Sequence, residues 1–388
     1  MAAFPLLDES EIAALNRQAD AILKTFAAHG YRRREPSVLQ PAEIFLERSG
    51  EEIRRRTFTL TDPSGNELCL RPDLTIPICR EHVTRGEGFP ARLCYHGLAF
   101  RHQPAEPHRP TQFHQAGAEL LGLDDRAAGD REIMSLAVEA LRASGLDAFE
   151  LKIGDLGLFS TLVDALNVPA QWRGRLKRHF WRTDYFDALL ERAASGSATN
   201  TQKLLANIGA MSESDARSAL EGLMDMFAEA PQGLRTREEI VDRLLEQSAD
   251  AASMRLDPKI ARVIARMLEI KGPATKALAD IRALTRDAGI GFGAPLAAME
   301  ARLAALEQLG LDPAKIRFAA RFGRNMEYYT GFVVEFWARD REGLVQIAGG
   351  GRYDTLLEAL GAKRPVPAVG FVIRTERVLS ARAAAGKA

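Results

Sequence analysis

The segment from Phe100 to Glu119 constrains the fold of this chain more than any other stretch. It reads FRHQPAEPHRPTQFHQAGAE, and it passes from a strand-like end through a proline-rich loop into a second strand-like run. Two such runs joined by a proline-rich connection predict paired antiparallel strands with a loop between them. The arginines of this segment, Arg101 and Arg109, could hold phosphate oxygens in their guanidinium forks, or they could simply be solvated.

Length and charge narrow the classes of protein to consider. A chain of 388 residues exceeds the usual size of a single core, so we expect two domains or one domain with a large insertion. Lysine and arginine together number 52, as do aspartate and glutamate, so there is no overall positive charge to attract nucleic acid. The composition is that of an ordinary soluble protein, and no apolar stretch is long enough to span a bilayer.

The cysteines and the N-terminus indicate a reducing compartment. Cys69, Cys79 and Cys94 are too few and too irregularly spaced for a disulfide framework or a zinc site, so we expect buried free thiols and no metal ion. The opening residues, MAAFPLLDE, lack the basic start and the apolar core of a signal peptide. Together these features predict a cytoplasmic protein.

The first 155 residues alternate between helical and strand-like patterns. Residues 10–29 have the apolar spacing of a helix, with Ser10 as the expected cap and Gly30 as the stop. Further expected elements are strands at residues 37–41, 57–61, 67–71, 92–100, 112–122 and 149–153, and helices at residues 42–48 and 130–143. Hairpins and short connections join these strands, so we expect an α+β fold with a largely antiparallel sheet.

After this part the pattern changes to helix. Residues 156–289 contain almost no strand-like alternation. The elements expected beyond them are helices at residues 295–309 and 374–384, and strands at residues 316–322, 328–338, 344–347 and 366–372. The glycines at 349–351 follow one of these strands and are typical of a close backbone approach. We therefore predict a body formed by residues 1–155 and 313–388, with a mainly helical insertion at residues 156–312.

Several motifs, in order along the chain, carry a resemblance to a known family. LRPDLT at 70–75, FRHQ at 100–103 with FHQAGAE at 113–119, RNMEYYTG at 324–331 and AGGGRYD at 348–354 resemble motifs of histidyl-tRNA synthetases. Residues 367–377 resemble motif 3 of the class II aminoacyl-tRNA synthetases, the class that contains those enzymes. This resemblance implies a class II synthetase-like antiparallel sheet flanked by helices.

The same resemblance implies a pocket for free histidine. Carried over position by position, its residues are Asp73, Thr75 and Gln115 for the α-ammonium group, Glu119 and Tyr329 for the imidazole with Tyr328 beside them, and Arg324 near the carboxylate. Asp73 replaces the usual glutamate of the motif. Taken alone, an acidic residue at this place has a simpler explanation, because the dipole at the start of a helix favours it.

The residues of the nucleotide half depart from the family pattern. The candidates for a remnant nucleotide site are Arg101, Gln103, Arg109, Arg374 and Arg377. Gln103 stands where the synthetases have the glutamate that orients ATP, and Arg374 stands where they have a glycine of motif 3. Glycine serves where a ligand approaches the backbone closely, so a guanidinium there should fill the adenine space. The resemblance also ends before any anticodon-binding domain.

A synthetase-like body with a histidine pocket and an eroded nucleotide pocket resembles the regulatory-subunit family of ATP phosphoribosyltransferase. That resemblance implies a non-catalytic chain, built as a homodimer, that joins a short catalytic subunit in a hetero-oligomer at the first step of histidine biosynthesis. It also implies L-histidine as a feedback effector, with no cofactor and no membrane or nucleic-acid partner.

Two other functions remain open from the sequence. The first is a truncated ligase that still activates histidine with ATP, which the residues at positions 103 and 374 disfavour. The second is an RNA-binding scaffold, which the balanced charge disfavours.

Overall fold

The computed structural model describes residues 7–46, 50–103, 110–168, 170–180, 186–191, 200–226, 256–322 and 328–386, and also residues 238, 240–242, 244, 245 and 248. The chain divides into two compact units. The first unit joins Met1–Phe159 to Glu269–Ala388, and the second is Ser160–Leu268.

The first unit is built on a mixed sheet in which antiparallel pairing dominates. Among the described residues its strands, in spatial order, are β1 (Arg32–Arg33), β5 (Ala91–Phe100), β6 (Gln112–Leu121), β12 (Ala368–Arg374), β11 (Leu344–Arg352), β10 (Phe332–Arg339), β7 (Glu150–Asp155), β9 (Arg317–Ala319) and β8 (Lys271–Pro273). In this sheet the β1–β5 and β7–β9 pairs are parallel, and the others are antiparallel. The predicted antiparallel α+β fold is therefore confirmed.

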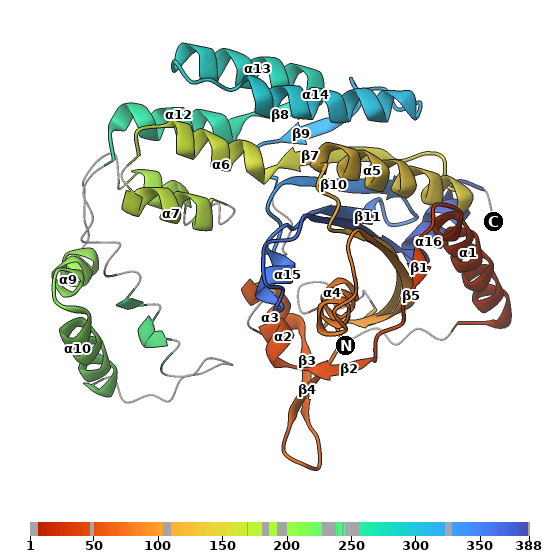
Figure 1. Ribbon diagram of the computed structural model, residues 1–388, viewed down its shortest axis with the longest axis horizontal. Helices are drawn as coiled ribbons and strands as arrows, with labels where there is room; N and C mark the ends of the chain where they lie inside the picture. The colour runs from red at the N-terminus through yellow and green to blue at the C-terminus, as the bar shows by residue number, and fades with distance from the viewer. Residues whose placement is uncertain are drawn as a thin grey trace. The chain divides into compact units, whose positions relative to one another are not determined.

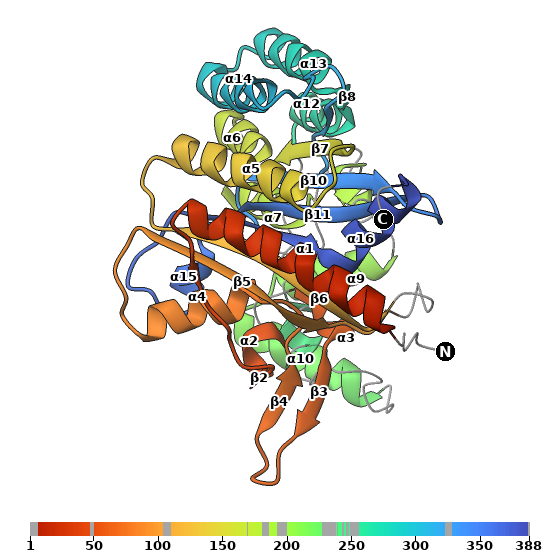
Figure 2. The ribbon, with the colours of Figure 1, turned by 90° about the vertical axis from the view of Figure 1, so that its right-hand side faces the viewer.

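Helices cover one face of this sheet. Those that pack on it or beside it are α1 (Glu9–Ala28), α5 (Arg126–Ala143), α16 (Thr375–Ala384), α13 (Ala274–Asp287) and α14 (Gly293–Gln308). Figure 2 shows α1 and α5 side by side across this face. The helix α1 buries Leu15, Ile22 and Phe26 at helical spacing, which fixes the stripe that faces the sheet.

The other face of the sheet carries smaller elements. The helix α4 (Thr75–Thr84) lies within the curve of β5 and β6, and α15 (Leu356–Ala359) packs beside it (Figure 1). A small second sheet has the order β2 (Leu39–Pro41), β4 (Glu67–Leu70), β3 (Phe58–Thr61), and the short helices α2 (Glu43–Leu46) and α3 (Gly50–Arg56) lie near it in sequence. The hairpin that leads into α4 is thus formed as predicted.

The regular secondary structure described in the second unit is helical. Its helices are α7 (Ala170–His179), α9 (Asn200–Gly209), α10 (Glu213–Met226) and α12 (Pro258–Glu269), and α6 (Leu156–Ala165) leads into it from the first unit. None of the helices in the described part of the chain combines the length and apolar character needed to cross a bilayer. Cys69, Cys79 and Cys94 are buried free thiols, as expected.

The structure corrects the predicted limits of the insertion. Residues 269–312, assigned to the insertion at 156–312, belong to the first unit together with α13 and α14. The physical reason is a strand that the sequence did not reveal, because β8 pairs with β9 and extends the main sheet. Three residues with the sequence KGP carry no periodic signal of a strand.

Two local predictions also need correction. Helix α1 is capped by Asp8 rather than Ser10, and Asp8 and Glu11 form a reciprocal capping box. The glycines at 349–351 lie within β11 rather than after it, because the strand continues to Arg352. There the backbones of neighbouring strands leave no room for side chains: a Cβ on Gly350 would lie 2.1 Å from the carbonyl oxygen of Gly370.

Candidate functional site

Strand register decides which side chains share the site. Glu119 of β6 lies directly opposite Gly370 of β12, and Gln115 of β6 lies opposite Arg374. Residues that face one another across an antiparallel pair point to the same side of the sheet, and every second residue along a strand does so as well. Glu119, Gln115 and Arg374 therefore point to one face, which is the face that carries α4.

Glu119 is the centre of this face, because its carboxylate collects three hydroxyl groups. The Thr75 hydroxyl donates to Oε1 at 2.7 Å and the Tyr95 hydroxyl donates to the same oxygen at 3.1 Å. The Tyr353 hydroxyl donates to Oε2. Glu119 is only 1% exposed, and burial raises its pKa to about 7 although the three hydroxyls act in the opposite direction.

Glycines make the space for this carboxylate. A Cβ on Gly370 would lie 1.6 Å from Oε2 of Glu119, and a Cβ on Gly117 would lie 2.4 Å from the Tyr95 hydroxyl oxygen. Real Cβ contacts are never that short, so only glycine fits at either place. The carboxyl and hydroxyl groups thus lie directly against the sheet backbone.

Asp73 lies just before α4 and is also buried. Its Oδ1 accepts a hydrogen bond from the Ile76 backbone N–H at 3.2 Å. Burial raises the pKa of Asp73, and the nearby positive charge of Arg101 opposes that rise. Within the described part of the chain, its Oδ2 atom and the Oε1 atom of Gln115 are buried without a hydrogen-bond partner. Two buried acceptors of this kind suit a ligand that donates hydrogen bonds.

The tyrosines of the RNMEYYTG motif lie beside this cluster. The Tyr328 ring packs edge-on against the Tyr353 ring with 5.6 Å between the ring centroids, and Tyr329 lies 6.5 Å from Tyr353 by the same measure. Tyr353 in turn donates to Glu119. The structure therefore brings together six of the predicted histidine-binding residues: Asp73, Thr75, Gln115, Glu119, Tyr328 and Tyr329.

Arg374 and Arg101 both lie against the ring of Phe113. The guanidinium carbon of Arg374 is 4.0 Å from the ring centroid, and that of Arg101 is 5.8 Å away. The Nε atom of Arg101 also donates to the Pro72 carbonyl oxygen at 2.7 Å, which holds it beside the segment of Asp73. Two cations therefore lie within cation–π distance of one aromatic ring.

Other predicted nucleotide-site residues make contacts elsewhere. The Gln103 amide donates to the Pro110 carbonyl oxygen at 2.6 Å and accepts from Arg56 at 2.9 Å. Arg377 donates to the Gln346 carbonyl oxygen at 2.8 Å. Two of the predicted site residues, Arg109 and Arg324, lie outside the described residues.

Sequence reasoning did not assign Tyr95 and Tyr353 to the site. Both hydroxyls contact Glu119, and both side chains are fully buried. Tyr353 belongs to the AGGGRYD motif, so the motif itself was a signal. The signal for Tyr95 was the strand pairing, which sets this ring opposite Gly117. Across the described ranges, no group of three or more His, Cys, Asp or Glu side chains is arranged to hold a metal ion.

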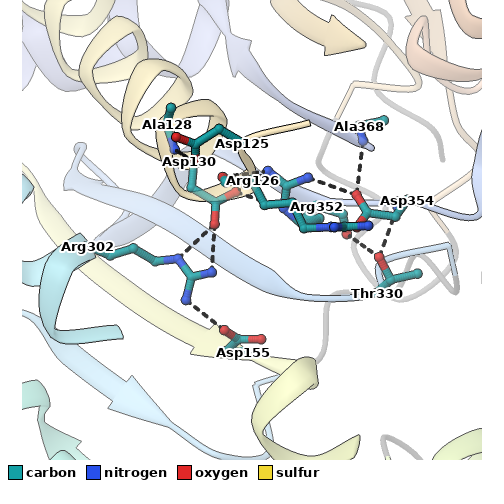
Figure 3. Close-up of polar contacts among 10 residues, drawn as sticks. All are labelled: Asp125, Arg126, Ala128, Asp130, Asp155, Arg302, Thr330, Arg352, Asp354 and Ala368. Atoms are coloured by element: carbon teal, nitrogen blue, oxygen red, sulfur yellow. Dashed lines mark hydrogen bonds and ion pairs between the residues drawn. The ribbon is translucent and has the colours of Figure 1, made fainter. Parts of the chain in front are cut away.

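A buried network of charges is centred on Asp130 (Figure 3). Asp130 of α5 is fully buried, and its Oδ1 accepts from Arg352 at 2.6 Å while its Oδ2 accepts from Arg302 at 2.7 Å. Arg302 also donates to Asp155 at 2.8 Å, and Arg352 donates to Asp354 at 2.8 Å. The opposite charges alternate along this chain of contacts, which joins α5 and α14 to strands β7 and β11.

The same network fixes the backbone on both sides of the tyrosines. The Asp354 N–H donates to the Thr330 hydroxyl at 3.0 Å, and the Thr330 N–H donates to the Arg352 carbonyl oxygen at 2.8 Å (Figure 3). Tyr353 lies between Arg352 and Asp354 in sequence, and Tyr329 immediately precedes Thr330. The network therefore positions the backbone that carries the Tyr353 and Tyr329 rings.

The raised pKa of Glu119 predicts a particular dependence of stability on pH. The native state holds a proton on this group up to pH about 7, whereas the unfolded state releases it near pH 4.5. The free energy of unfolding should therefore fall as pH rises between these values, by about 3 kcal/mol in total from this group. In Glu119→Gln this part of the decrease should be absent, as measured by urea unfolding at a series of pH values.

The difference between wild type and Glu119→Gln isolates this group. Asp73 also has a raised pKa, and it is present in both proteins. Parallel stability curves for the two proteins between pH about 5 and about 8 would contradict the raised pKa of Glu119.

Known proteins of similar sequence or structure share this fold. The sequence profile of the histidyl-tRNA synthetase family matches residues 5–258 and 222–378. Histidyl-tRNA synthetase from Nostoc sp. PCC 7120 has the same fold, with a TM-score of 0.60 at 17% identity, over 99% of this chain and 75% of that one. A structure described as an ATP phosphoribosyltransferase regulatory subunit/histidyl-tRNA synthetase from Bacillus halodurans gives a TM-score of 0.67 at 24% identity, over 98% of this chain and 82% of that one. The fold and the site thus define a body of the histidyl-tRNA synthetase type.

Relatives that match nearly the whole chain at higher identity are named as regulatory subunits. A protein of Allorhizobium ampelinum named ATP phosphoribosyltransferase regulatory subunit is 36% identical over 94% of this chain and 97% of its own length. A protein of the same name from Rhizobium rhizogenes is 33% identical over 98% of this chain and 100% of its own. This chain belongs to the family of ATP phosphoribosyltransferase regulatory subunits. The name of the family supports a non-catalytic role.

Proposed function

We propose that this chain is the non-catalytic subunit of an ATP phosphoribosyltransferase, and that it binds free L-histidine as an effector in the pocket around Glu119. The partner is a short catalytic subunit that carries the activity, in the first step of histidine biosynthesis. The chain acts as a homodimeric building block of a hetero-oligomer in the cytoplasm. Family membership supports the partner, and the chemistry of the pocket supports the ligand.

Among the described residues, two unpaired buried acceptors are the main support for free L-histidine as the ligand. Oδ2 of Asp73 and Oε1 of Gln115 are buried acceptors without a hydrogen-bond partner in the described part of the chain, and they suit the α-ammonium group of a free amino acid. Glu119 offers a buried carboxylate to an imidazole N–H. A site built to pair polar groups rejects ligands that lack them, because its own groups are then left unpaired.

Regulation follows from linkage between binding sites. An effector can shift the catalytic partner only if it binds two states of the complex with different affinity. The coupling is reciprocal, so substrates of the catalytic subunit must change the affinity for histidine by the same factor.

Thermal unfolding tests the proposed ligand. L-histidine at about a hundred times its Kd should raise the melting temperature of the chain by about 3 °C, because it binds only the native state. ATP at the same concentration should leave the melting temperature unchanged, because Arg374 lies against Phe113 and Gln103 is bonded to Arg56. Differential scanning calorimetry measures both.

Matched variants identify the pocket. Asp73→Asn should abolish the shift caused by histidine, whereas Asp312→Asn, at an exposed carboxylate, should leave it intact. A melt of the wild type that does not respond to millimolar histidine would refute the proposed ligand. Histidine-dependent exchange between pyrophosphate and ATP would instead support a histidine-activating ligase.

A further inference from the structure

Strand pairing sets the position of Arg374 beside the candidate site. It is the last residue of β12 and pairs with Gln115 across the β12–β6 ladder, so the two side chains are direct neighbours on one face. Its guanidinium lies 4.0 Å from the centroid of the Phe113 ring, and Phe113 is 5% exposed and two residues before Gln115. The ring and the strand together hold the cation beside the Gln115 amide.

A cation at this place suits a free amino acid. Its ammonium and carboxylate groups are attached to the same carbon atom, so a residue that binds one group must have a neighbour that binds the other. Asp73 and Gln115 supply the unpaired acceptors for the ammonium group. Arg374, the cross-strand partner of Gln115, supplies a positive charge beside these acceptors for the carboxylate.

Arg101 is the other described arginine that contacts Phe113, and it is bound differently. Its Nε atom donates to the Pro72 carbonyl oxygen, and its charge acts on Asp73. Arg101 therefore belongs to the segment before α4, where it offsets the buried Asp73 carboxylate. Arg374 lies on the Gln115 side, and a planar guanidinium above a ring can present its edge to a carboxylate as a two-pronged donor.

We propose that Arg374 binds the α-carboxylate of the amino acid held in this pocket. This proposal rests on the proposed function and adds a specificity residue to it. The Arg374 guanidinium above Phe113 thereby provides a charge that recognises free, zwitterionic histidine. It also discriminates against amines that lack the carboxylate.

A comparison of histidine with histamine tests this assignment. Isothermal titration calorimetry on the full chain should show that the wild type binds L-histidine much more tightly than histamine. In Arg374→Met, which replaces the guanidinium over Phe113 with an uncharged unbranched side chain, histidine should bind about 10- to 100-fold more weakly, the range expected for hydrogen bonds to a charged group. Histamine affinity should change little, so the preference for histidine should shrink by the same factor.

Two further variants separate a binding role from a structural one. Arg374→Lys should recover part of the preference, because the charge is kept without the planar fork. Arg339→Met, at an exposed arginine of the same sheet, should behave as the wild type. Equal losses for histidine and histamine in Arg374→Met would overturn the proposal and indicate a structural role.

The remaining outcomes are also distinct. An Arg374→Met protein that keeps the full preference would assign the carboxylate to another cation, and the proposed function would stand without this residue. A wild type that binds neither compound would refute the proposed function and this proposal together.

Discussion

Asp130→Asn is expected to lower the free energy of unfolding by about 3–5 kcal/mol, the usual cost of leaving a buried ion pair without one partner. Asp130 is fully buried and accepts hydrogen bonds from two guanidinium groups, those of Arg352 and Arg302, whose side chains are 5% and 12% exposed (Figure 3). Asparagine has nearly the same shape but no charge, and its amide N–H₂ would face one of these cations. Urea unfolding at neutral pH measures the loss.

An exposed contact of the same network supplies the control. Arg126 pairs with Asp354 at 2.8 Å, but its side chain is 58% exposed. Arg126→Met should therefore change stability by about 1 kcal/mol or less, as is usual for solvated ion pairs. If Asp130→Asn were as mild as Arg126→Met, the two buried arginines would have to reach water by rearrangement, and the network would not hold β7, β11, α5 and α14 together.

The sequence predicted local pairing well and distant pairing poorly. The strands at 92–100 and 112–122 lie within a residue of β5 and β6, because a proline-rich loop and apolar runs mark them clearly. The position of β12 between β6 and β11 depends on contacts between residues more than two hundred positions apart, which no local pattern encodes. β8 was missed because its three residues, KGP, are too few to show the alternation of a strand.

The candidate site shows the same difference between local motifs, which the sequence reveals, and distant contacts, which it does not. Motifs located Asp73, Thr75, Gln115 and Glu119, because each lies within a short recognisable stretch. The hydroxyl groups around Glu119 come from three separate segments, and only the register of β5 against β6 sets Tyr95 beside it. Likewise the contact between Arg374 and Phe113 requires the pairing of β12 with β6, which the resemblance did not supply.

Gly370→Ala should disrupt the pocket through the largest single clash on this face. The added Cβ would lie 1.6 Å from Oε2 of Glu119 and 2.8 Å from the carbonyl oxygen of Ala118, and the backbone oxygen cannot move without breaking the β12–β6 pairing. We expect a loss of about 3 kcal/mol in the free energy of unfolding, at the upper end of the usual cost of overpacking. Histidine should no longer raise the melting temperature, because the Glu119 carboxylate must leave its hydroxyl partners.

A second substitution identifies the cause of that loss. Gly88→Ala places a methyl group where no atom lies within 4 Å, so it should change stability by about 0.5 kcal/mol or less. In a Glu119→Ala background the carboxylate is gone, and Gly370→Ala should then cost clearly less than it does in the wild type, because the 1.6 Å contact no longer exists while the contact with the Ala118 oxygen remains. This non-additivity is the expected signature of two groups in contact. Fully additive losses in the double variant would mean that the Glu119 carboxylate does not occupy the space above Gly370.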